Sequence, residues 1–219
     1  MATTIAPPPV EIELEDLGRG GGGIPNLGWE GPGGPGEGAK GISDNRYRIG
    51  MWAALAGILM FFTAFISAYV VRKGLSNDWI PTSLPSLVWF NTLLLLASSL
   101  TLERSRHVLS DNSRFSRWWL LTTVLGAAFL VGQVVVWRQL IGDGVYISSN
   151  PSSSFFYVLT GAHGVHLSGG VFALGFLLFR NRQDPFGSVN RTPIDVVAIY
   201  WHFMDGLWIS LLLFLFFWR

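Results

Sequence analysis

The sequence contains no cysteine in its 219 residues. This absence excludes disulfide bonds, iron–sulfur clusters, covalently attached haem and any copper or zinc site that needs a thiolate. Only four histidines are present, so imidazole ligands could hold few metal ions. A redox centre in this chain would therefore depend on histidine and carboxylate side chains.

Charged residues are also scarce. They make up 13% of the chain, whereas soluble domains usually carry about 25%. The net charge is +1, and there is no basic cluster beyond a few arginines in connecting segments, so nothing favours nucleic-acid binding. Half of the residues are hydrophobic, which indicates that much of the surface faces something other than water.

Residues 1–45 differ in composition from the rest of the chain. Three prolines, Pro7–Pro9, precede a short acidic stretch, and a glycine-rich run follows from Gly18 to Gly41. Such a sequence cannot bury enough apolar area to offset its ordering entropy, so we predict an irregular tail. The tail has no apolar segment typical of a signal peptide, and we expect it to lie along a partner protein.

Five long apolar segments follow, at about residues 49–71, 86–102, 118–137, 155–179 and 196–218. About 20 residues of helix cross the hydrocarbon core of a bilayer, and a backbone without water must be helical. We therefore predict an all-α membrane protein with five transmembrane helices. Aromatic residues near the segment ends are typical of membrane interfaces: Trp52, Trp79, Trp118, Trp119, Trp137, Phe155, Phe156, Tyr157 and Trp218.

The basic residues predict an orientation in the membrane. Eleven of the 15 lysines and arginines lie in the tail and in the second and fourth connecting segments. The positive-inside rule then places the N-terminus in the cytoplasm and the C-terminus outside. We find no internal repeat, which disfavours an inverted-repeat transporter.

Two pairs of ionisable residues lie inside the last two apolar segments. His163 and His166 share one helical face, and so do His202 and Asp205. One interpretation is a metal or haem site with these four side chains as ligands. The other, which we favour, is a hydrogen-bonded network between helices in which Asp205 accepts from a histidine. Neighbouring glycines would allow close helix packing in either case: Gly161, Gly164, Gly169 and Gly170.

Other polar residues inside the segments are expected to join helices by hydrogen bonds: Asn91, Thr92, Ser98, Ser99, Thr101 and Gln133. Arg180, at the end of the fourth segment, is either an ordinary positive-inside anchor or a ligand for lipid phosphate. No glutamate follows Ile49 before Glu103, so a chain of carboxylates for proton pumping is not visible.

Two motifs resemble one family. The run from Trp201 to Trp208 resembles the Trp-His-Phe-Val-Asp-x-x-Trp signature in the last helix of cytochrome c oxidase subunit III. Thr160–His166 resembles its Thr-Gly-x-His-Gly-x-His segment. The resemblance covers residues 46–219 in order, with shorter likenesses at Asp143–Tyr146 with Phe155 and Phe156, at Asn91-Thr92 with Ala97–Ser99, and at Gly50-Met51 with Phe61–Thr63.

The resemblance implies a five-helix bacterial form that lacks the first two of seven helices, with two bundles separated by a lipid-holding cleft. Subunit III carries no haem or copper, so these cofactors would belong to partner subunits. His163, His166, His202 and Asp205 would then form a structural network. Arg180 matches the family arginine that contacts lipid phosphate, and Trp52 is a second candidate lipid-binding residue.

The expected function is that of a non-redox, lipid-binding subunit that stabilises subunit I of a proton-translocating oxidase in the bacterial cytoplasmic membrane. Partners would include subunit I, subunit II, small subunits, phospholipids and, through residues 1–45, a respiratory supercomplex. Alternatives are subunit III of a quinol oxidase and, from other classes, a small membrane b-type cytochrome or a transporter. Two family glutamates are replaced here by Ile58 and Val136, so their roles do not carry over.

Overall fold

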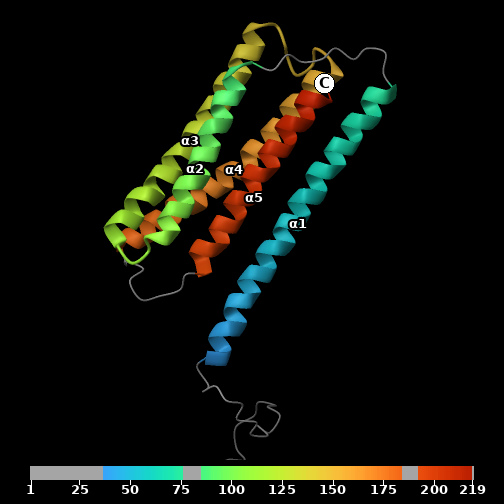
Figure 1. The fold of residues 1–219 in the computed structure, drawn as a ribbon. Helices are drawn as coiled ribbons and strands as arrows, with labels where there is room; N and C mark the ends of the chain where they lie inside the picture. The colour runs from blue at the N-terminus through green and yellow to red at the C-terminus, as the bar shows by residue number, and fades with distance from the viewer. Residues whose placement is uncertain (1–36, 76–84, 184–191, 219) are drawn as a thin grey trace, which may run out of the picture. The chain divides into compact units, whose positions relative to one another are not determined.

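The computed structural model describes the backbone of residues 37–75, 85–183 and 192–218 (Figure 1). Within these ranges the chain forms five helices and no strand: α1 (Glu37–Leu75), α2 (Leu87–His107), α3 (Asn112–Gly142), α4 (Pro151–Gln183) and α5 (Thr192–Phe217). The all-α prediction is confirmed for this part of the chain. Trp79, one of the aromatic residues predicted at a membrane interface, lies outside the described residues.

The chain divides into two units, Met1–Ala39 and Lys40–Arg219, and the helix packing described below belongs to the second. The predicted tail spans residues 1–45, of which residues 1–36 lie outside the described ranges. Residues 37–45 are the start of α1, so the helix begins before the apolar segment does. Extending an existing helix costs much less than nucleating one, which explains how a polar segment continues it.

Among the described residues, four helices are long and apolar enough to cross a membrane: Tyr47–Leu75, Asn112–Gly142, Pro151–Asn181 and Thr192–Phe217. Helix α2 covers nearly all of the predicted segment 86–102 and continues beyond it to His107. It is less apolar than the other four helices, because its buried face carries Asn91, Thr92 and Ser98. Its helical structure is confirmed, and its crossing of the membrane stays a prediction.

Helices α2 to α5 form a closed bundle. Helix α2 packs on α3, α3 on α4, α4 on α5, and α5 packs back on α2 (Figure 1). Trp119 donates from Nε1 to the Leu174 carbonyl at 2.9 Å and is fully buried between α3 and α4. Trp119, one of the aromatic residues predicted at a membrane interface, therefore lies in the core, where its indole joins two helices.

Helix α1 lies next to this bundle without close backbone contact. No described Cα of α1 comes within 8 Å of a Cα of another helix. One face is nevertheless buried, at Leu55, Phe62 and Tyr69, which recur every seven residues. The Tyr69 ring lies 4.9 Å from that of Phe214, and Lys73 Nζ donates to the Trp218 carbonyl at 2.6 Å. Long side chains thus connect α1 to the C-terminal end of α5, although the two backbones are not in close contact. The lipid-holding cleft expected between two bundles stays a prediction.

Trp201 fits into slots formed by glycines on two neighbouring helices. A Cβ atom at Gly126 of α3 would lie 2.5 Å from the Trp201 ring, and one at Gly170 of α4 would lie 3.2 Å from it. Close packing at Gly170 confirms the prediction for that residue. A Cβ atom at Gly164 or Gly169 would meet no described atom within 4 Å, so close packing there is not found.

The ends of α3 follow the usual rules for helix termini. Asp111 is the N-cap, and its carboxylate accepts from the backbone N–H groups of Ser113 at 3.1 Å and Arg114 at 3.2 Å. At the other end, Gly144 has φ +78°, which favours glycine. The Gly144 N–H donates to the Ile141 carbonyl at 3.0 Å, and the Val145 N–H donates to the Leu140 carbonyl at 2.9 Å. These bonds form a Schellman motif that ends the helix.

Candidate functional site

Polar side chains of α2 join it to the helices on both sides. Towards α3, Asn91 Nδ2 donates to the Phe129 carbonyl at 3.1 Å, and the Thr101 and Thr122 hydroxyls lie 2.8 Å apart. Towards α5, Ser98 accepts from Trp201 Nε1 at 3.0 Å, and Thr92 accepts from Trp208 Nε1 at 3.0 Å. The prediction that these polar residues join helices by hydrogen bonds is confirmed.

His163 lies in the interior of the bundle. Its side chain is fully buried, and its ring centroid is 5.0 Å from that of Trp208 and 6.1 Å from that of Phe129. Neither ring nitrogen has a hydrogen-bond partner among the described residues. The imidazole therefore packs as an aromatic side chain between α3 and α5.

His166 occupies the next turn of α4 and faces α1. Its Nδ1 lies 2.8 Å from the Ala162 carbonyl of its own helix, and its ring centroid is 5.7 Å from that of Phe62. Its backbone carbonyl accepts from the Tyr200 hydroxyl at 2.7 Å. This residue thus takes part in contacts of α4 with both α1 and α5.

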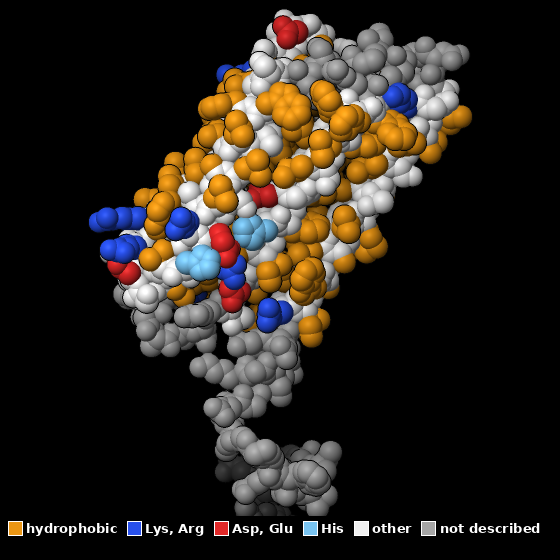
Figure 2. All heavy atoms as spheres, in the orientation of Figure 1, with side chains coloured by type: hydrophobic (Ala, Val, Ile, Leu, Met, Phe, Trp, Pro, Cys, Tyr) orange, Lys and Arg blue, Asp and Glu red, His pale blue; other side chains and the backbone are white. Residues whose placement is uncertain are grey.

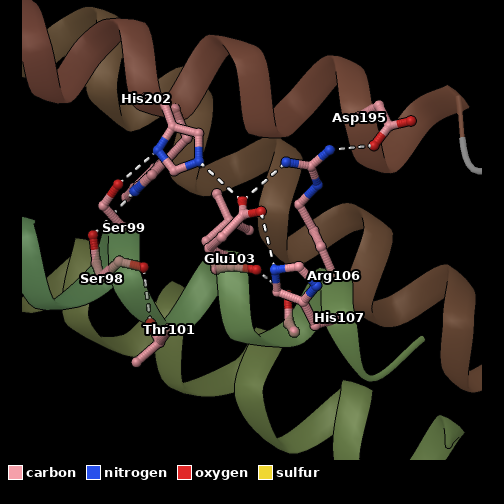
Figure 3. A network of polar contacts seen from close by, with 11 residues as sticks. Ser98, Ser99, Thr101, Glu103, Arg106, His107, Asp195 and His202 are labelled. Atoms are coloured by element: carbon pink, nitrogen blue, oxygen red, sulfur yellow. Dashed lines mark hydrogen bonds and ion pairs between the residues drawn. The ribbon is translucent and has the colours of Figure 1, made fainter. Parts of the chain in front are cut away.

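The side chain of His202 points towards α2, where it meets Ser99 and Glu103 (Figure 3). Its Nδ1 lies 2.6 Å from Ser99 Oγ, and its Nε2 lies 3.5 Å from Glu103 Oε2. Asp205, one turn further along α5, is 5% exposed and faces Ser99, but no described residue makes a hydrogen bond of normal geometry to its carboxylate. The network predicted among His163, His166, His202 and Asp205 does not appear as contacts between the two pairs of residues.

Glu103 is the centre of an ionic network between the end of α2 and the start of α5 (Figure 3). Arg106 donates to Glu103 at 2.9 Å and to Asp195 of α5 at 2.8 Å. His107 Nε2 lies 3.6 Å from Glu103 Oε1. Partial burial raises the pKa of Glu103, but the bonds and charges of Arg106 and His202 outweigh it, so the pKa is lowered overall.

This network was not predicted from the sequence. The three-residue spacing of Glu103 and Arg106 on one helical face was a usable signal, and so was the acidic residue Asp195 directly before the last apolar segment. Each of the paired side chains remains between 33% and 43% exposed, so each pair is worth only about 0.2–1 kcal/mol. The network is therefore of interest because it joins the end of α2 to the start of α5, and not because it adds much stability.

A hollow of about 240 Å³ opens beside this network. It lies between the C-terminal end of α2 and the N-terminal end of α5, and it is lined by Glu103, Arg106, His107, Leu109, Ile194 and Asp195. Within the described residues, no three histidine, aspartate or glutamate side chains gather so that they could hold a metal ion. The assignment of haem and copper to partner subunits stays a prediction.

The two candidate lipid-binding residues lie on different helices. Arg180 is exposed in the last turn of α4, and Trp52 is 60% exposed on α1. The positions of the missing family glutamates are occupied by Ile58, which packs against the core, and by fully buried Val136 of α3. Neither position provides a group that exchanges protons.

The described helices and their buried polar contacts define a polytopic α-helical membrane protein. The family model for cytochrome c oxidase subunit III matches residues 46–219. The "Probable cytochrome c oxidase subunit 3" of Nocardia farcinica is 36% identical over 173 residues, covering 76% of this chain and 85% of the relative. That of Mycobacterium tuberculosis is 33% identical over 181 residues, covering 80% and 89%.

The "Cytochrome c oxidase subunit 3" of Synechocystis is 30% identical over 159 residues, covering 68% of this chain and 66% of the relative. The chain therefore belongs to the cytochrome c oxidase subunit III family. It is a subunit of a terminal oxidase complex and has other oxidase subunits as partners.

Proposed function

We propose that this chain is the non-redox subunit that holds phospholipid and stabilises the large redox subunit, subunit I, of a bacterial oxidase. Cytochrome c is the proposed electron donor, rather than a quinol, because the relatives from Nocardia and Mycobacterium are named for cytochrome c. Family membership does not support the small b-type cytochrome or the transporter.

The exposed apolar surface of α1 is the observation on which the proposal depends. Only 17% of its most apolar stretch is buried by the rest of the chain, compared with 44% for α5. Large apolar side chains such as Leu59, Met60 and Val71 are at least half exposed. In a membrane, this surface must be covered by lipid tails or by helices of partner subunits. A scaffold that binds both would have such a surface.

Arg180 is the residue that we propose holds a lipid headgroup. It makes no ion pair with a described residue, and it stands exposed at the end of a membrane-spanning helix. A guanidinium group can bind phosphate through two parallel hydrogen bonds, which are stronger than neutral ones. Trp52 would contribute an amphipathic ring at an interface.

The proposed location is the bacterial cytoplasmic membrane, with the N-terminus inside. This orientation places Arg180 and the Glu103 network on the cytoplasmic side, because the connecting segments that follow α2 and α4 carry most of the arginines.

The test is a comparison of the whole oxidase purified in mild detergent from wild type and from an Arg180→Gln variant. We expect the variant to lose at least one tightly bound phospholipid per complex, measured by mass spectrometry, and to lose activity sooner during turnover. Arg138→Gln is the matched control, since Arg138 is an exposed arginine near the end of α3. Equal lipid content in both variants would contradict the role of Arg180.

Two further results bear on the main proposal. Copurification of a large haem–copper subunit, together with a dicopper centre in the second subunit, would support the proposed complex and its donor. A stoichiometric Soret band from this chain purified alone, or solute uptake by the chain alone in liposomes, would overturn it.

A further inference from the structure

The face formed by α2 and α5 carries a row of polar side chains within an apolar surface. Figure 2 shows acidic, basic and imidazole side chains gathered together, with hydrophobic side chains above and beside them. From the helix ends inwards, the row contains Asp195, Arg106, Glu103, His202 and Ser99. Neighbouring members are joined by contacts of 2.6–3.5 Å, so the row is a connected structure.

This row of polar side chains extends into the part of the helices that is expected to lie in the hydrocarbon core of the membrane. His202 lies about six residues after the start of the last apolar segment at residue 196, which corresponds to about 9 Å of helix within a hydrocarbon core of about 30 Å. The side chain of His202 is nevertheless 39% exposed, and that of Glu103 is 43% exposed. Polar groups at such depth normally face protein or a water-filled cavity. Something other than lipid tails therefore covers this face.

The charge of the row indicates the chemistry of the partner. Glu103 and Asp195 carry two negative charges, and Arg106, which pairs with both, carries one positive charge. One negative charge is thus left over beside the hollow of about 240 Å³. This excess attracts a lysine or arginine side chain, which the hollow is positioned to admit.

We propose that this α2–α5 face is the docking surface for a membrane-spanning helix of the large partner subunit, which places a basic side chain against Glu103 and Asp195. The inference rests on the proposed function and adds which face is used and what the partner presents. The row then sets the register of the two helices along the membrane, because a displacement by one turn, about 5.4 Å, would separate the opposite charges.

The experiment uses a photo-crosslinking amino acid introduced into the intact oxidase in its native membrane. Leu96 is the test position, because it lies three residues before Ser99 and seven before Glu103, on the same side of α2, and is 39% exposed. Val131 of α3, which is 65% exposed, is the control position. Both replace exposed side chains, so the fold is retained.

We expect irradiation to join the Leu96 variant to the large subunit in at least fivefold higher yield than the Val131 variant. Crosslinking of the Leu96 variant only to lipid or to a second copy of this chain would overturn the proposal, and so would equal yields at the two positions. If the large subunit copurifies but Leu96 does not crosslink to it, the docking surface is wrong while the proposed function stands.

Charge variants provide the second measurement. Glu103→Gln combined with Asp195→Asn removes the negative charge but keeps the shape and much of the hydrogen bonding. We expect the amount of large subunit retained at high salt in mild detergent to fall severalfold. The control is Asp143→Asn. Asp143 is an exposed carboxylate at the C-terminal end of α3, and its variant is expected to behave as wild type. Unchanged retention in the double variant would refute the role of the charges.

Discussion

The indole Nε1 of Trp208 donates to the Thr92 hydroxyl at 3.0 Å, and the same hydroxyl donates to the Val88 carbonyl at 2.8 Å. Thr92 is therefore fixed in one orientation by its own helix while it accepts from α5. The Trp208 ring also lies 5.1 Å from that of Phe129 and 5.0 Å from that of His163. One side chain of the last helix thus contacts α2, α3 and α4.

The first prediction concerns this bond. Thr92→Val keeps the shape of the side chain but leaves the buried Trp208 N–H without an acceptor. We expect the free energy of unfolding to fall by about 1 kcal/mol, in line with hydrogen bonds measured between membrane helices. The measurement is the thermal unfolding of the purified complex. Thr92→Ser, which keeps the hydroxyl, should stay close to wild type; equal loss in both variants would show that packing rather than the bond matters.

The second prediction concerns the slot for Trp201. In Gly126→Ala the new methyl group would lie 2.5 Å from the ring, so either the Trp201 ring or the α3 backbone must shift. We expect a loss of about 1–3 kcal/mol, typical of overpacked cores. Gly175→Ala on α4 is the control, because its methyl group meets no described atom within 4 Å. Thermal unfolding would rank the two, and a Gly126→Ala protein as stable as the control would contradict the close packing.

The third prediction concerns the N-cap of α3. The side-chain hydrogen bond from Ser113, with the backbone bonds from Arg114 and Ser113, lowers the pKa of Asp111. A carboxylate with a lowered pKa stabilises the folded state above its unfolded pKa, and this contribution disappears as the pH falls through the folded pKa. Hydrogen exchange in the first turn of α3 should therefore become faster in acid, after correction for the intrinsic rate.

The matched variants for this cap are Asp111→Asn and Asp111→Ala. Asparagine can still accept from the helix N–H groups but does not titrate. The Asp111→Asn protein should therefore show no acid-dependent loss of protection, whereas Asp111→Ala should exchange fast at every pH. A similar pH response in wild type and Asp111→Asn would mean that another group is responsible.

The fourth prediction concerns Arg106, which links α2 and α5 through Glu103 and Asp195. Arg106→Gln leaves the two carboxylates without a shared cation, at a cost of less than about 1 kcal/mol, because the pairs are partly exposed. The lowered pKa of Glu103 places this stabilisation above the ordinary range of a glutamate pKa, and it is lost in acid. The stability difference from wild type should shrink as the pH falls. Arg104→Gln, an exposed neighbour, should show no such trend.

Hydrophobic length and the family motifs were sufficient to predict the helices and the family. Apolar segments of about 20 residues leave the backbone no alternative to helix in a membrane. The bonds of Thr92 and Ser98 followed from the same reasoning, since a polar side chain on such a helix seeks a partner on another. The direction of His202 did not follow, because a shared face within one helix does not tell which neighbour it meets.

The Glu103 network was missed for a related reason. It joins residues on α2 and α5 that are 89 positions apart, so only the rotation of both helices about their axes brings them together. The early start of α1 was missed because a glycine-containing polar stretch has low helix propensity, and only the apolar helix that follows sustains it.

Trp201 has a consequence for how this chain can diverge from its relatives. Its indole is bonded to Ser98 of α2 and occupies space that Gly126 of α3 and Gly170 of α4 leave open. A larger residue at either glycine is tolerated only if the side chain at position 201 is smaller, and a smaller residue at 201 leaves a void and removes the hydrogen bond that the Ser98 hydroxyl accepts. Substitutions at these four positions should therefore be inherited together, and descendants that alter one of them alone should be selected against.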